Sequence, residues 1–301
     1  MPYFNIVAET SENTVVTEYE PVKKRSDSYQ SEAELEQEFI RLLCEQGYEY
    51  LPIHTEKDLI SNLRKKLEEL NNYQFSDTEW VAFFKNAVAN PNEHIVEKTR
   101  KIQEDNVQVL TRDDGSSKNI TLIDKKNIHN NRLQVINQYK VNAAPGSREG
   151  SLGCVIGTEN GAKHDNRYDV TVLVNGLPLV HIELKRRGVA IREAFNQINR
   201  YQRDSFWAGC GLYEYIQIFV ISNGTNTKYY SNSTRRNAEK EHEKRGTSKT
   251  KTSNSFEFTC FWADANNRVI PDLIDFTKTF FAKHTILNIL TKYCIFTSED
   301  M

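Results

Sequence analysis

Polar and apolar positions between residues 167 and 203 are ordered in a way that predicts strand, tight turn, strand and helix. Residues 170–174 form a run rich in β-branched side chains. The following Asn175-Gly176 pair indicates a two-residue hairpin, because both central residues of a type I′ turn need a positive φ. A second strand is expected over 179–185, and an amphipathic helix after it.

The second strand carries polar side chains at the end of an apolar run. Side chains alternate between the two faces of a strand, so His181, Glu183 and Lys185 point the same way. Asp169 enters the partner strand close to them. In the helix that follows, Gln197 and Tyr201 are four residues apart and therefore project together toward the hairpin. The pattern gathers Asp169, Glu183, Lys185, Gln197 and Tyr201 at one end of the predicted hairpin.

This ordered set resembles the core of the PD-(D/E)xK nucleases, in the RecB-like branch that adds a Q-x-x-x-Y motif. More narrowly, the text NRYDVTVLVNGLPLVHIELKRRGVAIREAFNQINRY, followed by IFVISNGTNTKYY, resembles the N-terminal nuclease region of the restriction (R, motor) subunit of type I restriction–modification enzymes. The resemblance extends from about Ser31 to about Cys294. An isolated E-x-K is a weak motif, whereas the whole ordered set in its strand context is specific.

The resemblance implies roles for individual residues. Asp169 and Glu183, with the main-chain carbonyl of Leu184, are expected to bind Mg²⁺, which prefers oxygen ligands and keeps several waters. Lys185 is expected to orient the attacking water and stabilise anionic phosphate oxygens. The resemblance further assigns Gln197 and Tyr201 to the surroundings of the lysine, the metal waters or the DNA phosphates.

Glu36 is the remaining residue that the resemblance assigns to the site. The helix pattern L-E-x-x-F-I-x-x-L-x-x-x-G-Y places a glutamate of related nucleases at Glu36. The alternative for Glu36 is an exposed acid on a helix surface.

Other interpretations of these residues remain open from the sequence. Asp169, Glu183 and Lys185 are also compatible with a structural salt bridge at a sheet edge, and His181 with a packed histidine. The segment 124–126 (Asp-Lys-Lys) is either a solvated charge cluster or a DNA-backbone contact. Five arginines are either solvated or bind phosphates: Arg186, Arg187, Arg192, Arg200 and Arg203.

The rest of the chain predicts an α/β fold with a mixed central sheet flanked by helices and helical accessory elements. A helix is expected from Ser31, its N-cap, to Gly47, with Glu34 completing a capping box. Further elements are expected as follows: a peripheral strand at 14–18, helices within 55–104 with Asp77 as a cap, a hairpin over 107–126 turning at Asp114-Gly115, a loop over 143–166, strands at 215–221 and 256–262, a disordered or exposed insertion at 234–254, and an apolar helical tail.

Residues 1–265 are expected to form the endonuclease domain, with core elements at about 31–50 and 105–262. Residues 266–301 are expected to be a linker or the start of a first motor domain, because no phosphate-binding G-x-x-x-x-G-K-[ST] motif occurs in the chain. The ATP of the family is therefore expected to be used by motor domains outside this chain.

Composition indicates which kind of protein and which cellular compartment to expect. A net charge of −2 argues against a globally basic nucleic-acid-binding protein, and favours a module brought to DNA by an assembly. The five cysteines are odd in number and lack C-x-x-C, which indicates reduced thiols. With no signal-peptide or membrane-spanning pattern, a cytoplasmic protein without membrane contact is expected.

The resemblance implies double-stranded DNA as substrate, and methyltransferase and specificity subunits as partners. The expected function is Mg²⁺-dependent cleavage of unmodified DNA away from the recognition site, coupled to ATP-driven translocation. Two alternatives are a stand-alone metal-dependent nuclease of the same fold and a non-catalytic module that docks on DNA or protein.

Overall fold

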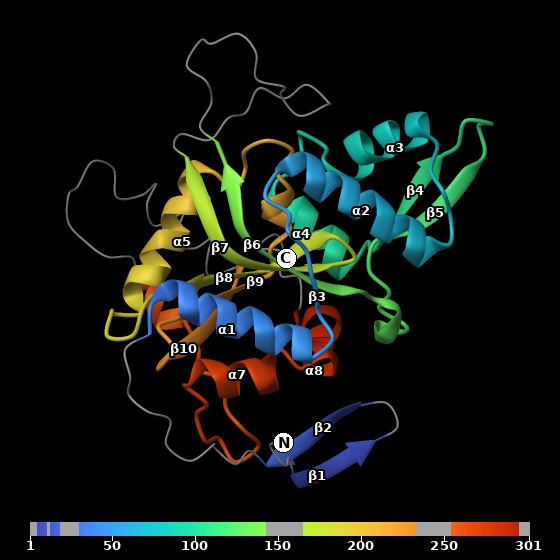
Figure 1. Ribbon diagram of the computed structural model, residues 1–301. Coiled ribbons are helices and arrows are strands. Elements are labelled where there is room, and N and C mark those ends of the chain that lie inside the picture. The colour runs from blue at the N-terminus through green and yellow to red at the C-terminus, as the bar shows by residue number, and fades with distance from the viewer. Residues whose placement is uncertain (1–4, 11–12, 19–29, 143–164, 233–253, 295–301) are drawn as a thin grey trace.

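The computed structural model describes residues 5–10, 13–18, 30–142, 165–232 and 254–294. Its centre is a six-stranded mixed sheet in the order β10-β9-β8-β7-β6-β3. The chain has the mixed α/β architecture expected from the sequence, with helices packed around this sheet (Figure 1). The predicted loop at 143–166 and insertion at 234–254 lie almost entirely outside the described residues.

The strands of the sheet differ in length and direction. The bounds are β3 Glu49–Tyr50, β6 Leu133–Val141, β7 Asn166–Val174, β8 Leu177–Leu184, β9 Ile218–Ser222 and β10 Thr227–Ser231. Two neighbouring pairs are parallel, β3 with β6 and β8 with β9, and the other pairs are antiparallel. Since parallel neighbours need a crossover connection, the helix α5 (Arg192–Asp204) lies between β8 and β9 in the chain.

Helix α1 (Glu32–Glu45) begins as the sequence predicts. The Ser31 side chain accepts a hydrogen bond from the main-chain N–H of Glu34, and the Glu34 carboxylate accepts one from the N–H of Ser31. This capping box satisfies donors that a helix start leaves unpaired. Gly47 follows the helix with a φ of 86°. The helix contacts strands β3 and β8.

Accessory elements surround this core. Three helices lie within the predicted stretch: α2 Glu56–Asn71, α3 Asp77–Phe83 and α4 Ile95–Gln103. A separate hairpin is made of β4 (Val107–Thr111) and β5 (Ser117–Thr121), and another of β1 (Asn5–Thr10) and β2 (Asn13–Glu18). The structure corrects the cap of α3, because Ser76 rather than Asp77 accepts the capping bond, from the N–H of Glu79.

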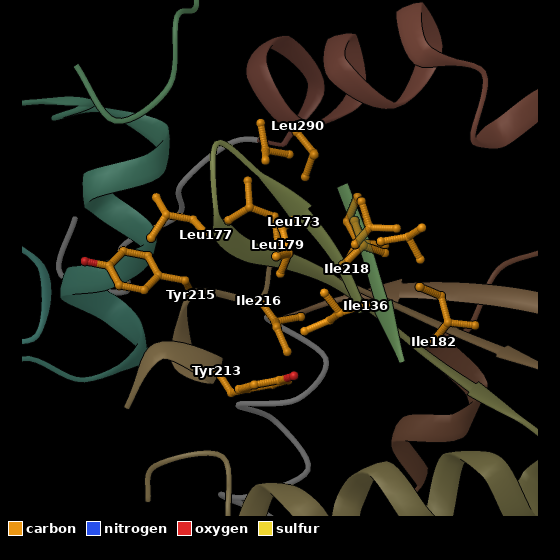
Figure 2. Close-up of a cluster of buried hydrophobic side chains, with 14 of the residues drawn as sticks. Ile136, Leu173, Leu177, Leu179, Ile182, Tyr213, Tyr215, Ile216, Ile218 and Leu290 are labelled. Carbon is orange, nitrogen blue, oxygen red and sulfur yellow. The ribbon is translucent and has the colours of Figure 1, made fainter. Parts of the chain in front are cut away.

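The apolar tail is helical, as predicted, and packs on the core. Helices α7 (Leu273–Phe280) and α8 (Lys283–Asn288) follow one another, and α7 lies beside α1 (Figure 1). The Phe39 and Phe281 rings meet edge to face with centroids 5.4 Å apart, and the Tyr48 hydroxyl donates to the Phe281 carbonyl at 2.8 Å. Leu290 reaches the same buried cluster as Leu173, Leu177 and Leu179 of the central hairpin (Figure 2).

Two predicted strands are wrong in part. Residues Leu212–Tyr215 form a 3₁₀ turn, so the strand expected from Tyr215 begins at Ile218. Residues Asn254–Phe258 also form a 3₁₀ turn, and the segment after it pairs with the sheet through a bridge of Cys260 with Tyr229 on β10. A short apolar run does not by itself distinguish a strand from a turn, which explains both errors.

The cysteines only partly follow the prediction. Cys44, Cys260 and Cys294 are free thiols. Cys210 takes part in a disulfide, so the prediction of reduced thiols is wrong for this residue. In the described part of the chain, no helix has the length and the apolar character needed to cross a lipid bilayer.

Candidate active site

The hairpin β7–β8 brings the predicted acidic residues together. Asn175 and Gly176 form its turn with φ values of 52° and 85°, which are the positive values that a type I′ turn requires. Val170 pairs with Ile182, and the same register places Asp169 opposite Glu183. The Asp169 Oδ2 atom accepts a hydrogen bond from the main-chain N–H of Leu184 at 2.9 Å. The two carboxylates are therefore neighbours at the open end of the hairpin.

Burial makes both carboxylates hard to ionise. Burial, and then the charge of Glu183, raise the pKa of Asp169 to about 7, against a weaker lowering by the Leu184 N–H. Burial likewise raises the pKa of Glu183 to about 7, and the charge of Lys185 is the main opposing effect. Neighbouring acids with raised pKa values are typical of functional sites, because such a pair attracts a proton or another cation.

Lys185 contacts one carboxylate of this pair. Its ammonium donates to Glu183 Oε1 at 3.1 Å and to the Leu184 carbonyl at 3.0 Å. The Glu183 Oε2 atom is buried and has no hydrogen-bond partner. The carboxylate and the carbonyl predicted as metal ligands thus already share one cation, the lysine ammonium.

The donor set fits a hard divalent cation. Asp169, Glu183 and the Leu184 carbonyl supply oxygen atoms only, and one buried carboxylate oxygen has no hydrogen bond. Mg²⁺ accepts a small number of protein oxygens because it keeps several water ligands. Among the described residues, no group of three or more histidine, cysteine, aspartate or glutamate side chains is arranged as a metal cluster.

Gln197 and Tyr201 lie on α5 as predicted, and they contact each other and the strand of Asp169. The Gln197 amide donates to the Tyr201 hydroxyl, which donates to the Arg167 carbonyl at 2.9 Å. Burial and then the charge of Glu183 raise the pKa of Tyr201. The two side chains therefore brace β7 two residues before Asp169, and these hydrogen bonds go to each other and to β7 rather than to Lys185.

Glu36 comes from a different part of the chain to the edge of the same site. It is 8% exposed, so the alternative of an exposed helix acid does not hold. Its carboxylate accepts hydrogen bonds from the amides of Asn137, at 2.6 Å, and Gln138. Burial raises the pKa of Glu36, these amides lower it, and the charge of Asp169 raises it further.

His181 is a packed histidine. It is fully buried among the rings of Tyr168, Tyr201, Phe206 and Phe219. Burial lowers its pKa to about 4, so the ring is neutral at pH 7. Its Nε2 atom lies 3.5 Å from Glu183 Oε2.

All five arginines have contacts on the protein, and the Arg203 carbonyl accepts a hydrogen bond from the Trp207 indole. The main-chain N–H of Arg186 donates to Glu32 at 3.3 Å, and the Arg187 guanidinium donates to Gln30 at 3.4 Å. The guanidinium of Arg192 lies over the ring of Phe256 and that of Arg200 over the ring of Tyr201. The segment 124–126 forms a turn in which the Asp124 carboxylate accepts main-chain N–H bonds, while Lys126 is exposed.

Two residues of this neighbourhood were not predicted from the sequence. Asn137 and Gln138 of β6 hold Glu36, and they are consecutive amides in a strand that also carries the polar residues Gln134 and Lys140. Because polar residues occur elsewhere in the same strand, the sequence gives no local signal for this pair.

Comparison with known proteins agrees with this architecture. Residues 29–238 match the family described as type I restriction enzyme R protein N terminus. The chain is 46% identical to the type I restriction enzyme EcoprrI endonuclease subunit of Escherichia coli over 295 residues, which is 98% of this chain and 83% of that protein. It is 34% identical to the SsaAORF53P endonuclease subunit of Staphylococcus saprophyticus over 90% of the chain, but spans only 25% of that relative.

The match over most of the chain, together with the mixed sheet, defines the class. The chain belongs to the family of N-terminal regions of type I restriction enzyme R proteins. A more distant relative is the HindI endonuclease subunit of Haemophilus influenzae, 27% identical over 64% of the chain and 18% of that protein.

Proposed function

We propose that this chain is the DNA-cleaving module of a type I restriction enzyme, a Mg²⁺-dependent endonuclease of the PD-(D/E)xK type. The observation that supports the proposal most strongly is the convergence of Asp169, Glu183 and Lys185 at the open end of one hairpin. A structural salt bridge accounts for one carboxylate beside the lysine. It does not account for a second acid with a raised pKa next to the first.

Each group of residues would have a separate role in phosphodiester hydrolysis. Asp169, Glu183 and the Leu184 carbonyl would hold Mg²⁺, which when bound neutralises phosphate charge and makes hydroxide available at neutral pH. The Lys185 ammonium lies about 3 Å from two of those ligands and would donate to a phosphate oxygen or orient the attacking water. Gln197 and Tyr201 would hold β7, and hence Asp169, in place through the Arg167 carbonyl.

The wider role follows from the relatives and is also a proposal. The substrate would be unmodified double-stranded DNA in the cytoplasm, cut away from the recognition site. Methyltransferase and specificity subunits would complete the complex, and motor domains outside this chain would use ATP for translocation. The near-neutral net charge fits a module that an assembly brings to DNA.

The test uses the assembled enzyme with Asp169→Ala or Lys185→Ala. We expect each change to lower the cleavage rate by about 100-fold or more, as loss of a group acting on the reacting atoms does, while ATP-driven translocation continues. Lys57→Ala, at an exposed lysine on α2, serves as the matched control and should cleave normally. Retained cleavage, or loss of translocation together with cleavage, would show that the three residues are structural.

A further inference from the structure

One residue of β6 departs from strand geometry beside the candidate site. Gln138 has a φ of 52°, a left-handed conformation that is uncommon for a residue other than glycine, asparagine or aspartate. The register runs from Asn137↔Val170 to Tyr139↔Tyr168, so Gln138 and Asp169 occupy the positions between these pairs. The strained residue of β6 is therefore opposite the candidate metal ligand of β7. Strain of this kind persists only where the surrounding structure holds it.

The strain has a geometric consequence. Consecutive side chains of a regular strand point to opposite faces of the sheet, so two consecutive amides cannot both reach one carboxylate. Here the amides of Asn137 and Gln138 both donate to Glu36, one to each carboxylate oxygen. The left-handed backbone at Gln138 breaks the alternation and turns both amides to the same side.

The orientation of Asn137 is set independently. The Tyr50 hydroxyl donates to Asn137 Oδ1 at 3.0 Å, which leaves the Nδ2 group to face Glu36. The His54 Nδ1 atom lies 3.1 Å from the Asn137 carbonyl. Strand β3 and the segment after it thus fix the position of Asn137, and Asn137 in turn binds Glu36.

The Glu36 carboxylate, which these amides hold, interacts electrostatically with Asp169. Each oxygen of Glu36 has an amide donor, and the carboxylate is buried on the first turns of α1. The charge of Asp169 acts on it directly. A divalent cation at Asp169 would relieve the repulsion between the two acids, so the position of Glu36 affects how strongly the site attracts a cation.

We propose that Asn137 and Gln138 are positioning residues, and that the left-handed turn of β6 at Gln138 serves to hold Glu36 beside Asp169 for divalent-cation binding. The inference rests on the metal site of the proposed function. It predicts that Gln138 acts through Glu36 and not through the stability of the sheet.

The test is a Mn²⁺ titration of this chain with a short DNA duplex present, followed by electron paramagnetic resonance. Glycine accepts a positive φ without strain, so Gln138→Gly should fold with an unfolding midpoint at or near that of the unmodified chain. Its affinity for Mn²⁺ should fall by about 10-fold, as when a residue that orients a metal ligand is lost. Glu36→Gln should weaken Mn²⁺ binding to the same extent.

The double variant separates positioning from general destabilisation. If Gln138 acts through Glu36, adding Gln138→Gly to Glu36→Gln should lower the affinity no further, whereas independent effects would multiply. Asn267→Gly is the matched control, since Asn267 has a φ of 59° in an exposed turn, and it should bind Mn²⁺ normally.

Two results would overturn the inference, and they differ from a failure of the proposed function. Normal Mn²⁺ binding by Gln138→Gly, or multiplying effects in the double variant, would contradict the positioning role while Asp169→Ala still abolishes binding. Normal binding by Asp169→Ala would instead refute the metal site itself.

Discussion

At the scale of single residues, the central feature is that the fold makes ionisation of Asp169 and Glu183 costly. Both carboxylates are buried and lie beside each other, and the charge of Lys185 offsets only part of the resulting rise in their pKa values. With both pKa values near 7, the pair holds on average about one proton at neutral pH. A divalent cation can replace that proton, so the strain of the metal-free pair favours binding.

This arrangement predicts how stability depends on pH. An acid whose pKa is raised by folding contributes stability that is complete below its ordinary pKa of 3.8 to 4.5 and is lost as pH rises through about 7. The metal-free chain should therefore lose several kcal/mol of unfolding free energy from this pair between pH 4 and pH 8.

Asp169→Asn with Glu183→Gln removes both titrations and should be the more stable protein at pH 8. Urea unfolding of the two proteins across this pH range measures the difference. Parallel stability curves would show that the pair ionises without cost.

At the scale of elements, the β7–β8 hairpin was predictable because its signals are local. Asn175-Gly176 specifies the turn, and the β-branched run specifies the first strand. The sequence does not predict strand β10, and it predicts strand for Tyr215 and for residues 256–258, which lie in 3₁₀ turns. A short apolar run is compatible with more than one backbone conformation, so the pattern alone does not decide between strand and turn.

The hairpin turn also packs on another element, which predicts the effect of a single methyl group. A Cβ atom at Gly176 would lie 2.6 Å from the Leu63 Cα atom of α2, and the φ of 85° is itself unfavourable for alanine. Gly176→Ala should cost about 3 kcal/mol or more of unfolding free energy, from backbone strain plus overlap.

Gly115→Ala is its control. Gly115 has a φ of 81° and nothing within 4 Å of the added atom, so only the strain of about 1 kcal/mol applies. Equal losses of unfolding free energy in the two variants, measured by urea unfolding, would show that α2 moves aside to accommodate the added methyl group.

At the scale of the whole molecule, the site is assembled from segments far apart in the sequence. Glu36 on α1, the amides on β6 and the carboxylates of the hairpin meet only through the sheet order. Spacing along the chain predicted which hairpin residues share a strand face and that the α5 pair shares a helix face, and the resemblance supplied their roles and Glu36. Asn137 and Gln138 could not be predicted, because their role depends on a backbone conformation that tertiary contacts impose.

The predicted domain boundary at residue 265 stays a prediction. Helices α7 and α8 lie beyond it, yet Phe276, Phe280 and Phe281 are fully buried in the same cluster as the sheet. In the described part of the chain, this C-terminal segment therefore packs as part of the core.

The central claim is that Asp169, Glu183 and the Leu184 carbonyl bind a divalent cation beside Lys185. Diffraction from crystals of this chain with duplex DNA and Mn²⁺, collected for the anomalous signal of manganese, tests it most directly. The account predicts an anomalous peak in contact with both carboxylates, with the Lys185 ammonium no longer bonded to Glu183 Oε1. Carboxylates that turn to opposite sides of the sheet, or a peak bound elsewhere with this pair still holding the lysine, would contradict it.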